Sequence, residues 1–175
     1  MRRHLLLLGT IVLSLSIITL AYFYAKKKGV LPGGEKVELE VASEFALPNS
    51  DGEITKLSDI KGKVKVVNFW ASWSPYSKDE LKYLNEIKNE FGEDIAVVAV
   101  SRDHNIDEGK RFLVDNNIED NLIFVFDKED EYYKLMSGYA VPETVFLNKK
   151  DEIIEHIHRP MEKDEFIEEI NNVLN

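Results

Sequence analysis

Residues 64–81, VKVVNFWASWSPYSKDEL, place a nearly continuous apolar run directly before an aromatic turn and a helical pattern. A strand that is covered on both faces has this kind of apolar run, so we expect a central strand at 64–71. Apolar residues at helical spacing follow and predict a helix at 75–91 with one buried face. We expect Ser74 to cap this helix and Pro75 to occupy its first position.

The segments on either side of this stretch alternate between strands and helices. They are a hairpin with an Asp-Gly turn at 45–57, strands at 95–100, 122–126, 144–147 and 152–158, and helices at 107–116, 130–139 and 161–174. Consecutive strand–helix–strand units require parallel pairing, whereas the last two strands form an antiparallel hairpin. The order therefore predicts an α/β fold with a mixed central sheet, flanking helices and an extra N-terminal β-hairpin. In the 130–139 helix, Tyr132, Leu135, Met136 and Tyr139 should lie on one side.

The N-terminal region differs in composition from the rest of the chain. Leu5–Tyr24 is an uncharged, mostly apolar run of about 20 residues, enough to cross a bilayer as a helix. We expect a transmembrane anchor at 1–25, a flexible linker at 26–40 and one domain at 41–175. The alternative is a cleaved signal peptide, but the run is long for one and its cleavage site is poor. Basic residues flank both ends of the run, so charge does not set its orientation.

Charge and cysteine content exclude several classes of function. The 175 residues carry a formal net charge of −10, although the first forty residues contain six Lys or Arg and only three Glu. The acidic excess therefore lies in the domain, and it argues against nucleic acid as a partner. The chain contains no cysteine, which excludes disulfides, thiolate nucleophiles and Cys-ligated metal sites.

Two histidines form the best candidate for a metal site, but the sequence does not complete it. His156 and His158 alternate on a predicted strand and so share one face. A zinc site needs further ligands, and none is apparent nearby in the sequence. The chain also has no phosphate-binding loop and no dinucleotide-binding glycine motif. We therefore expect neither a metal nor a cofactor.

Three motifs together resemble one family of proteins. FWASW-SPYS at 69–77 resembles the thioredoxin-fold active-site motif, in which a Trp precedes Cys-x-x-Cys. The segment FALPNSDGEITKLSDIKGK at 45–63 resembles the hairpin of membrane-anchored thiol–disulfide oxidoreductases of the ResA/TlpA type, in the redoxin (AhpC-TSA) group. GYAVPETVFL at 138–147 is similar to the cis-proline loop and the strand that follows it. The resemblance implies a thioredoxin-like fold for 41–175, and an extracytoplasmic domain on a single-pass anchor in the cell membrane.

The chain differs from this family at the residues that carry out the reaction. Ser74 and Ser77 stand where the resemblance places the two cysteines, and Asn68 stands where many thioredoxins keep a buried acid. Thiol–disulfide exchange requires a thiolate that attacks sulfur, and a serine hydroxyl stays protonated near neutral pH unless a general base activates it. We find neither a sulfur nor a base in the motif, so no catalytic residue is intact.

The binding surface of the family is retained. In the family, the residue before the cis-proline offers backbone hydrogen bonds to an extended peptide, and Val141 and Pro142 match these two positions. Trp73, Pro75 and Tyr76 would form an apolar rim beside them, although each of these residues also has a purely structural explanation. We therefore expect a peptide-docking surface and an extended polypeptide as a partner.

Three functions are compatible with these features. The first is a non-catalytic peptide- or protein-binding relative of the oxidoreductases, anchored in the membrane by its N-terminal helix. The alternative is a thiol–disulfide oxidoreductase, of the cytochrome c maturation or disulfide reduction type, seen as an engineered Cys-to-Ser variant. The third is an accessory subunit of a membrane maturation complex. We favour the first, because the landmarks of the fold remain while both sulfur positions are lost.

Overall fold

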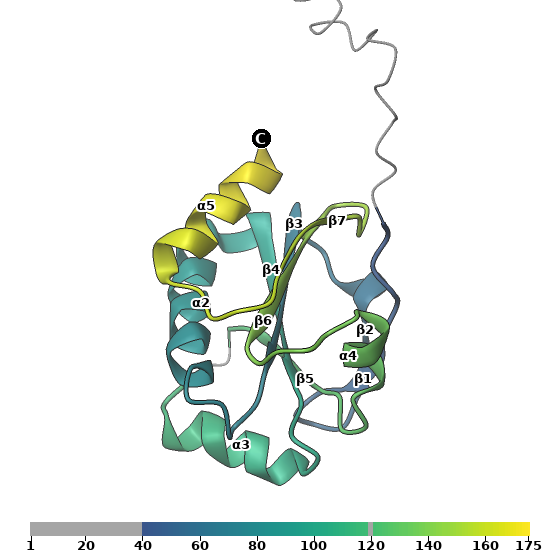
Figure 1. Cartoon of the computed structure of the whole chain (residues 1–175), viewed down its shortest axis with the longest axis vertical. Helices are drawn as coiled ribbons and strands as arrows, with labels where there is room; N and C mark the ends of the chain where they lie inside the picture. The colour runs from purple at the N-terminus through teal and green to yellow at the C-terminus, as the bar shows by residue number, and fades with distance from the viewer. Residues whose placement is uncertain (1–39, 119–120) are drawn as a thin grey trace, which may run out of the picture. The chain divides into compact units, whose positions relative to one another are not determined.

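The computed structural model describes residues 40–118 and 121–175 (Figure 1). The predicted anchor at 1–25 and all but the last residue of the linker predicted at 26–40 lie outside these residues. Across the described parts of the chain, no helix is both long and apolar enough to span a membrane.

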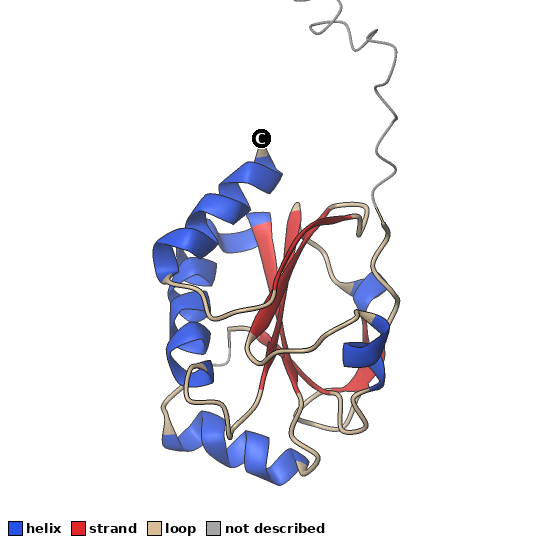
Figure 2. Cartoon of the chain, in the orientation of Figure 1, coloured by secondary structure: helices blue, strands red, loops and turns tan. Residues whose placement is uncertain are grey.

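A five-stranded mixed sheet forms the centre of the domain (Figure 2). Its strands are β3 (Val64–Trp70), β4 (Ile95–Ser101), β5 (Ile123–Phe126), β6 (Glu143–Asn148) and β7 (Ile153–Ile157), in the spatial order β5-β4-β3-β6-β7. The β3–β4 and β4–β5 pairs are parallel, whereas β6 is antiparallel to both β3 and β7. The predicted mixed sheet is confirmed.

The predicted N-terminal hairpin is also present, as a separate two-stranded sheet. It consists of β1 (Ala46–Pro48) and β2 (Ile54–Lys56), and a 3-10 turn, η1 (Leu57–Asp59), follows it. The Asn49 side chain accepts the N–H groups of Asp51 and Glu53 at 2.9 Å, which closes the loop between the two strands. Gly52 lies in this loop at a φ of +84°, a conformation that glycine adopts without a steric penalty.

Helices cover both faces of the central sheet (Figure 1). α2 (Ser77–Phe91), α3 (Ile106–Asp115) and α5 (Lys163–Leu174) pack on one face, and a 3-10 turn, η2 (Gly92–Asp94), follows α2. α4 (Glu131–Leu135) and the hairpin cover the other face. Neighbouring residues of β3 belong to opposite cores, as strand geometry requires: Trp70 packs toward α3, and Phe69 packs toward α4.

The start of α2 differs from the prediction. The helix begins at Ser77, not at residue 75, and Ser74 provides no cap because its hydroxyl instead bonds to the carbonyl of Val141. Pro75 consequently lies in a turn before the helix and not at its first position. A contact with a distant loop has replaced the local capping interaction.

The helix predicted at 130–139 is also shorter than expected. α4 ends at Leu135, because Ser137 adopts a left-handed conformation (φ +58°) and Gly138 donates its N–H to the carbonyl of Tyr133. Tyr132 and Met136 are buried, but Leu135 is 63% exposed and Tyr139 is 74% exposed, so the expectation that all four share one side is wrong. Tyr139 lies beyond the helix, in the loop that leads to β6.

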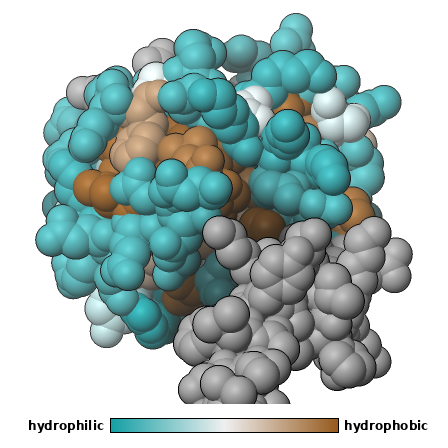
Figure 3. All heavy atoms as spheres, turned by 90° about the horizontal axis from the view of Figure 1, so that it is seen from above, coloured by the Kyte–Doolittle hydropathy of each residue, from teal (hydrophilic) through white to brown (hydrophobic). Residues whose placement is uncertain are grey.

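Charged and polar residues make up most of the surface seen from above in Figure 3, with apolar residues gathered in one area of that face. This agrees with a sequence in which 31% of the residues are charged.

Candidate functional site

The turn between β3 and α2 is anchored to the end of β4. Ser72 donates its hydroxyl to Asp103 at 2.7 Å, and its N–H contacts the same carboxylate at 3.1 Å. Ser101 donates a further hydrogen bond to Asp103 at 2.9 Å, and the Asp103 side chain is buried. A buried carboxylate that accepts several hydrogen bonds is well satisfied, so this contact fixes the turn that carries residues 73–77.

Ser74 and Ser77, the residues at the family's two cysteine positions, are both buried and both hydrogen-bonded into the fold. The Ser77 hydroxyl oxygen accepts the N–H of Ala71 at 3.2 Å. The Ser74 hydroxyl donates to the carbonyl of Val141 at 3.2 Å, which joins the serine turn to the loop before β6. Both side chains therefore have structural roles.

The structure brings together the five residues that were predicted to bind a peptide, but it exposes them unequally. Trp73 and Tyr76 are 64% and 55% exposed, and Pro75 is exposed between them. Val141 is half-buried, and the peptide bond between Val141 and Pro142 is cis, as the motif predicts. The Pro142 side chain is buried. A ligand can therefore reach the aromatic rim and the Val141 backbone more easily than the proline ring.

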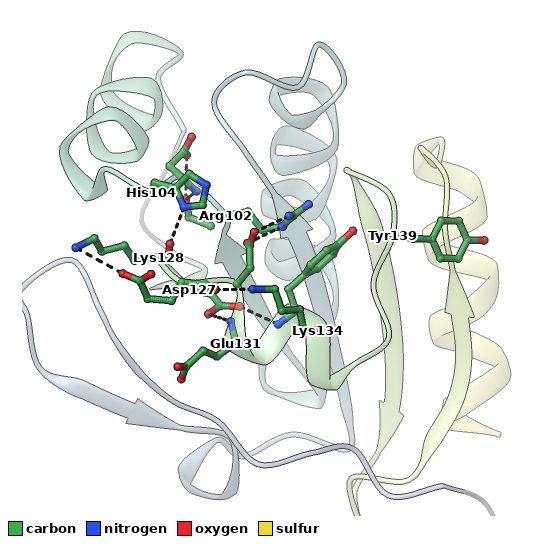
Figure 4. Close-up of polar contacts among 12 residues, drawn as sticks. Arg102, His104, Asp127, Lys128, Glu131, Lys134 and Tyr139 are labelled. Carbon is green, nitrogen blue, oxygen red and sulfur yellow. Dashed lines mark hydrogen bonds and ion pairs between the residues drawn. The ribbon is translucent and has the colours of Figure 1, made fainter.

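A network of polar side chains holds the loop before Pro142 (Figure 4). Arg102 makes a two-pronged contact with Asp130, with both bonds at 2.8 Å, and its guanidinium lies 3.5 Å from the centre of the Tyr133 ring. The Tyr133 hydroxyl then donates to the carbonyl of Ala140 at 2.8 Å. This chain of contacts links the end of β4 to the loop. Tyr139 points away from the network.

A buried carboxylate also begins α4. Asp127 accepts the N–H groups of Glu131 at 2.9 Å and of Tyr133 at 2.8 Å, and so satisfies donors that a helix start leaves free (Figure 4). It directly follows β5 and is buried. Asp127 therefore positions the tyrosine that holds the loop.

Glu80 is a buried acid that sequence reasoning missed. Its carboxylate accepts the N–H of Met161 at 2.6 Å and the amide of Asn68 at 2.9 Å. Burial raises the pKa of Glu80 to about 7, and these two neutral donors only partly oppose the rise. Glu80 is thus a potential base one helical turn after Ser77, outside the four-residue motif in which the sequence shows none. However, no hydrogen bond within the described residues joins Glu80 to Ser74 or Ser77.

The helical spacing contains the signal that would have identified Glu80. Ser77, Leu81 and Leu84 are buried on α2, and Glu80 lies on the same stripe, one helical turn after Ser77. An acid on the buried stripe of an amphipathic helix is uncommon and marks a candidate site.

Glu143, at the start of β6, is a further buried carboxylate near the site. Its Oε2 atom contacts the Nδ1 atom of His158 at 2.7 Å and accepts the N–H groups of Tyr139 and Ala140 at 3.4 Å. Burial alone would raise the pKa of Glu143, but the facing imidazoles of His156 and His158 reverse the effect and lower it. Of the two acids Glu80 and Glu143, Glu143 is therefore the one that stays charged.

Glu143 also supplies the third potential metal ligand that the sequence did not show. One ligand atom each from Glu143, His156 and His158 lies within 4.8 Å of the other two. Residues 143 and 156 are far apart in sequence, so only the strand pairing brings them together.

Known proteins of similar sequence and structure agree with this architecture. The sequence profile of the AhpC/TSA family matches residues 39–157. The thiol-disulfide oxidoreductase ResA of Oceanobacillus iheyensis is 30% identical over 142 residues, which cover 77% of this chain and 71% of the relative. ResA of Bacillus cereus is 24% identical over 175 residues, 99% of each chain.

Solved structures show the same fold. A proposed thiol:disulfide interchange protein DsbE from Chlorobium tepidum superimposes with a TM-score of 0.71 at 24% identity, over 78% of this chain and 97% of that one. StoA from Bacillus subtilis gives a TM-score of 0.61 at 24% identity, over 73% and 96%. The chain thus belongs to the AhpC/TSA family, as a thioredoxin-fold relative of the ResA thiol–disulfide oxidoreductases in which Ser74 and Ser77 replace the two cysteines.

Proposed function

We propose that this chain is a non-catalytic member of its family that binds an extended polypeptide without forming a covalent bond to it. The observation that carries the proposal is that Ser74 and Ser77 replace both sulfurs while the surrounding site stays in place. The Ser74 hydroxyl bonds to Val141, and the Ser77 hydroxyl bonds to Ala71. Exchange through a mixed disulfide needs sulfur, so the retained architecture can act only by binding.

Backbone groups and exposed aromatic rings support the binding role. The hydrogen bonds of the described residues include none from the Val141 N–H, so this donor is open to a partner. The rings of Trp73 and Tyr76 are more than half exposed beside it. A free backbone donor next to exposed aromatic side chains suits an extended peptide, which supplies a carbonyl to the first and side chains to the second.

The catalytic half of the proposal is tested by reduction of insulin with dithiothreitol. The full chain should give no turnover above a control without protein. Turnover above that control would contradict the proposal, because it would require redox chemistry without cysteine.

The binding half can be tested with the chain's own fluorescence. The sequence has two tryptophans: Trp70 is fully buried and Trp73 is exposed, so Trp73 reports on ligands at the rim. Titration with insulin B chain whose cysteines are blocked should change the emission, and Trp73→Phe should abolish the change. Tyr76→Ala should weaken binding about tenfold, since an exposed aromatic contact contributes about 1 kcal/mol or more. Ile54→Ala, another exposed apolar residue, serves as the matched control.

Two outcomes of this titration would contradict the binding proposal. One is an unchanged emission of the wild-type chain at millimolar peptide. The other is equal affinity in the Tyr76→Ala and Ile54→Ala variants, which would place the peptide elsewhere.

We further propose that residues 1–25 anchor the chain in the cell membrane with the domain on the extracytoplasmic side. The apolar run Leu5–Tyr24 and the similarity to ResA support this placement. Cells that express the full chain with a C-terminal tag should retain it in carbonate-washed membranes. Protease added to spheroplasts should remove the tag, whereas protection until lysis would place the domain in the cytoplasm.

A further inference from the structure

The pairing of β6 with β7 brings two histidines to one carboxylate. Thr144 lies opposite Ile157 and Val145 lies opposite His156, so His158 follows opposite Glu143. Side chains that are directly opposite or diagonal on one face of an antiparallel pair come within contact distance. Both imidazoles therefore face Glu143, on the side of the sheet that α4 covers.

A β-bulge creates this arrangement. The register shifts between Phe146 and Leu147: Leu147 pairs with Ile153, whereas Phe146 pairs with Glu155, which leaves Ile154 as an extra residue. Without the extra residue, the same hairpin would align Glu143 with Ile157. Because side chains alternate along a strand, that register would turn both histidines to the opposite face from Glu143.

In the cluster of Glu143, His156 and His158, two buried polar atoms lack a hydrogen-bond partner within the described residues. They are Oε1 of Glu143 and Nε2 of His156, which lie 3.9 Å apart. The separation is too long for a hydrogen bond, and the Glu143 side chain is completely buried. A buried carboxylate oxygen without a partner is costly, so a positive ion between the two atoms would remove the cost for both.

We propose that Glu143, His156 and His158 bind a divalent first-row transition metal ion, with Zn²⁺ as the best match. Two imidazole nitrogens and one carboxylate oxygen form a donor set of the kind that zinc accepts, with a fourth position left for solvent or a ligand. The His156 and His158 side chains are 16% and 24% exposed, so the cluster is open on one side. Tyr139 stacks on His158 with ring centres 4.2 Å apart and holds the orientation of that imidazole.

The alternative occupants of the gap are a water molecule or nothing at all. In either case the cluster is a hydrogen-bonded contact between Glu143 and His158 that has no preference for zinc. Isothermal titration of the metal-free full chain with ZnCl₂ separates these cases. We expect one equivalent to bind with a dissociation constant in the micromolar range or below, and Mg²⁺, which prefers oxygen ligands, not to compete.

His156→Gln is the decisive variant. It removes the Nε2 atom of His156, a proposed metal ligand that makes no hydrogen bond within the described residues. It should weaken Zn²⁺ binding at least about tenfold while the chain without metal stays folded, as circular dichroism would show. His104→Gln changes an exposed histidine elsewhere and should leave the affinity unchanged. Co²⁺ bound to the wild-type chain should give the intense visible absorption of four-coordinate cobalt, which His158→Gln should abolish.

Either of two results would overturn the inference. The first is no Zn²⁺ binding at 100-fold excess metal over protein. The second is equal affinity in the wild type and His156→Gln, which would place the ion at another site. Neither outcome depends on peptide binding, so the metal site and the proposed function stand or fall separately.

Discussion

Glu80, on α2, and Glu143, at the start of β6, are both buried carboxyls, yet their pKa values move in opposite directions. Glu80 is surrounded by neutral donors, so burial dominates and the acid is half protonated near pH 7. Glu143 faces two imidazoles, which outweigh burial and keep it charged. Burial sets the cost of a charge, and the partners decide whether the charge persists.

The comparison also shows how the two sides of the site have diverged. The α2 side carries the positions where the family keeps its sulfurs, and here they hold neutral hydroxyls that bond to the fold. The β6–β7 side carries the charge and the nitrogen ligands.

The largest expected effect comes from returning sulfur to the α2 side. The double variant Ser74→Cys, Ser77→Cys should catalyse insulin reduction more than about tenfold faster than either single variant, because exchange requires both an attacking and a resolving thiol. Dithiothreitol-dependent turbidity measures the rate. If the double variant stays inactive while a disulfide forms in it, the residues around the two cysteines no longer support exchange. The two sides would then differ in more than the two missing sulfur atoms.

The next largest effect tests how tightly the β6–β7 side is packed. An added Cβ at Gly138 would lie 2.2 Å from the Tyr133 ring and 2.3 Å from Oε1 of Glu143. Gly138→Ala should therefore lower the free energy of unfolding by at least about 3 kcal/mol, measured by urea denaturation. Gly109→Ala is the matched control: its nearest contact is 3.0 Å, and alanine favours a helix, so its loss should be smaller. Equal losses would show that Glu143 can move.

The titration of Glu80 sharpens the comparison of the two acids. Because its folded pKa is raised, the unfolded chain releases the Glu80 proton first, and stability falls as pH rises from about 4.5 to about 7 and is flat above. The total loss should be about 3 kcal/mol. Glu80→Gln should remove this component, seen as the difference between the unfolding free energies of the wild type and the variant at each pH. A difference that is the same at pH 5 and pH 8 would show that Glu80 titrates normally.

The smallest expected effect comes from the exposed ring of Tyr139, which stacks on His158. Tyr139→Ala should cost less than about 1 kcal/mol, because the ring is 74% exposed and contributes mainly its stacking on His158. Tyr139→Phe keeps the stacked ring and should match the wild type in thermal unfolding. A loss in the Phe variant as large as in the Ala variant would assign the effect to the hydroxyl.

Much of the fold follows from local periodicity. The buried strands β3 and β4, the apolar stripe of α2 and the N-terminal hairpin were predictable, because each has a pattern that matches its own geometry. The start of α2 was not, because a capping serine and a serine that bonds to a distant loop look alike in sequence. Tyr139 was misplaced because the helix ends early: Ser137 adopts the left-handed conformation, and the glycine that signals the helix end, Gly138, follows it.

The candidate site was only partly predictable. Motifs located Ser74, Ser77 and the loop before Pro142, and the helical stripe contained enough information to find Glu80. The position of Glu143 beside His156 depends on the pairing of β6 with β7, and that pairing depends on a bulge. If the residues of β6 and β7 are paired outward from the turn without the bulge, the Glu143 carboxylate is assigned to the opposite face from the two histidines.

The extra residue Ile154 has a consequence for how related chains are compared. A relative could keep the glutamate and both histidines, lose one residue from β7, and turn the two imidazoles into the core beneath α5. Conservation of the three side chains is therefore not enough to trace this cluster through evolution. The trait that must be inherited is the number of residues between the turn and the first histidine, and a single-codon deletion there would erase the cluster without altering any of its members.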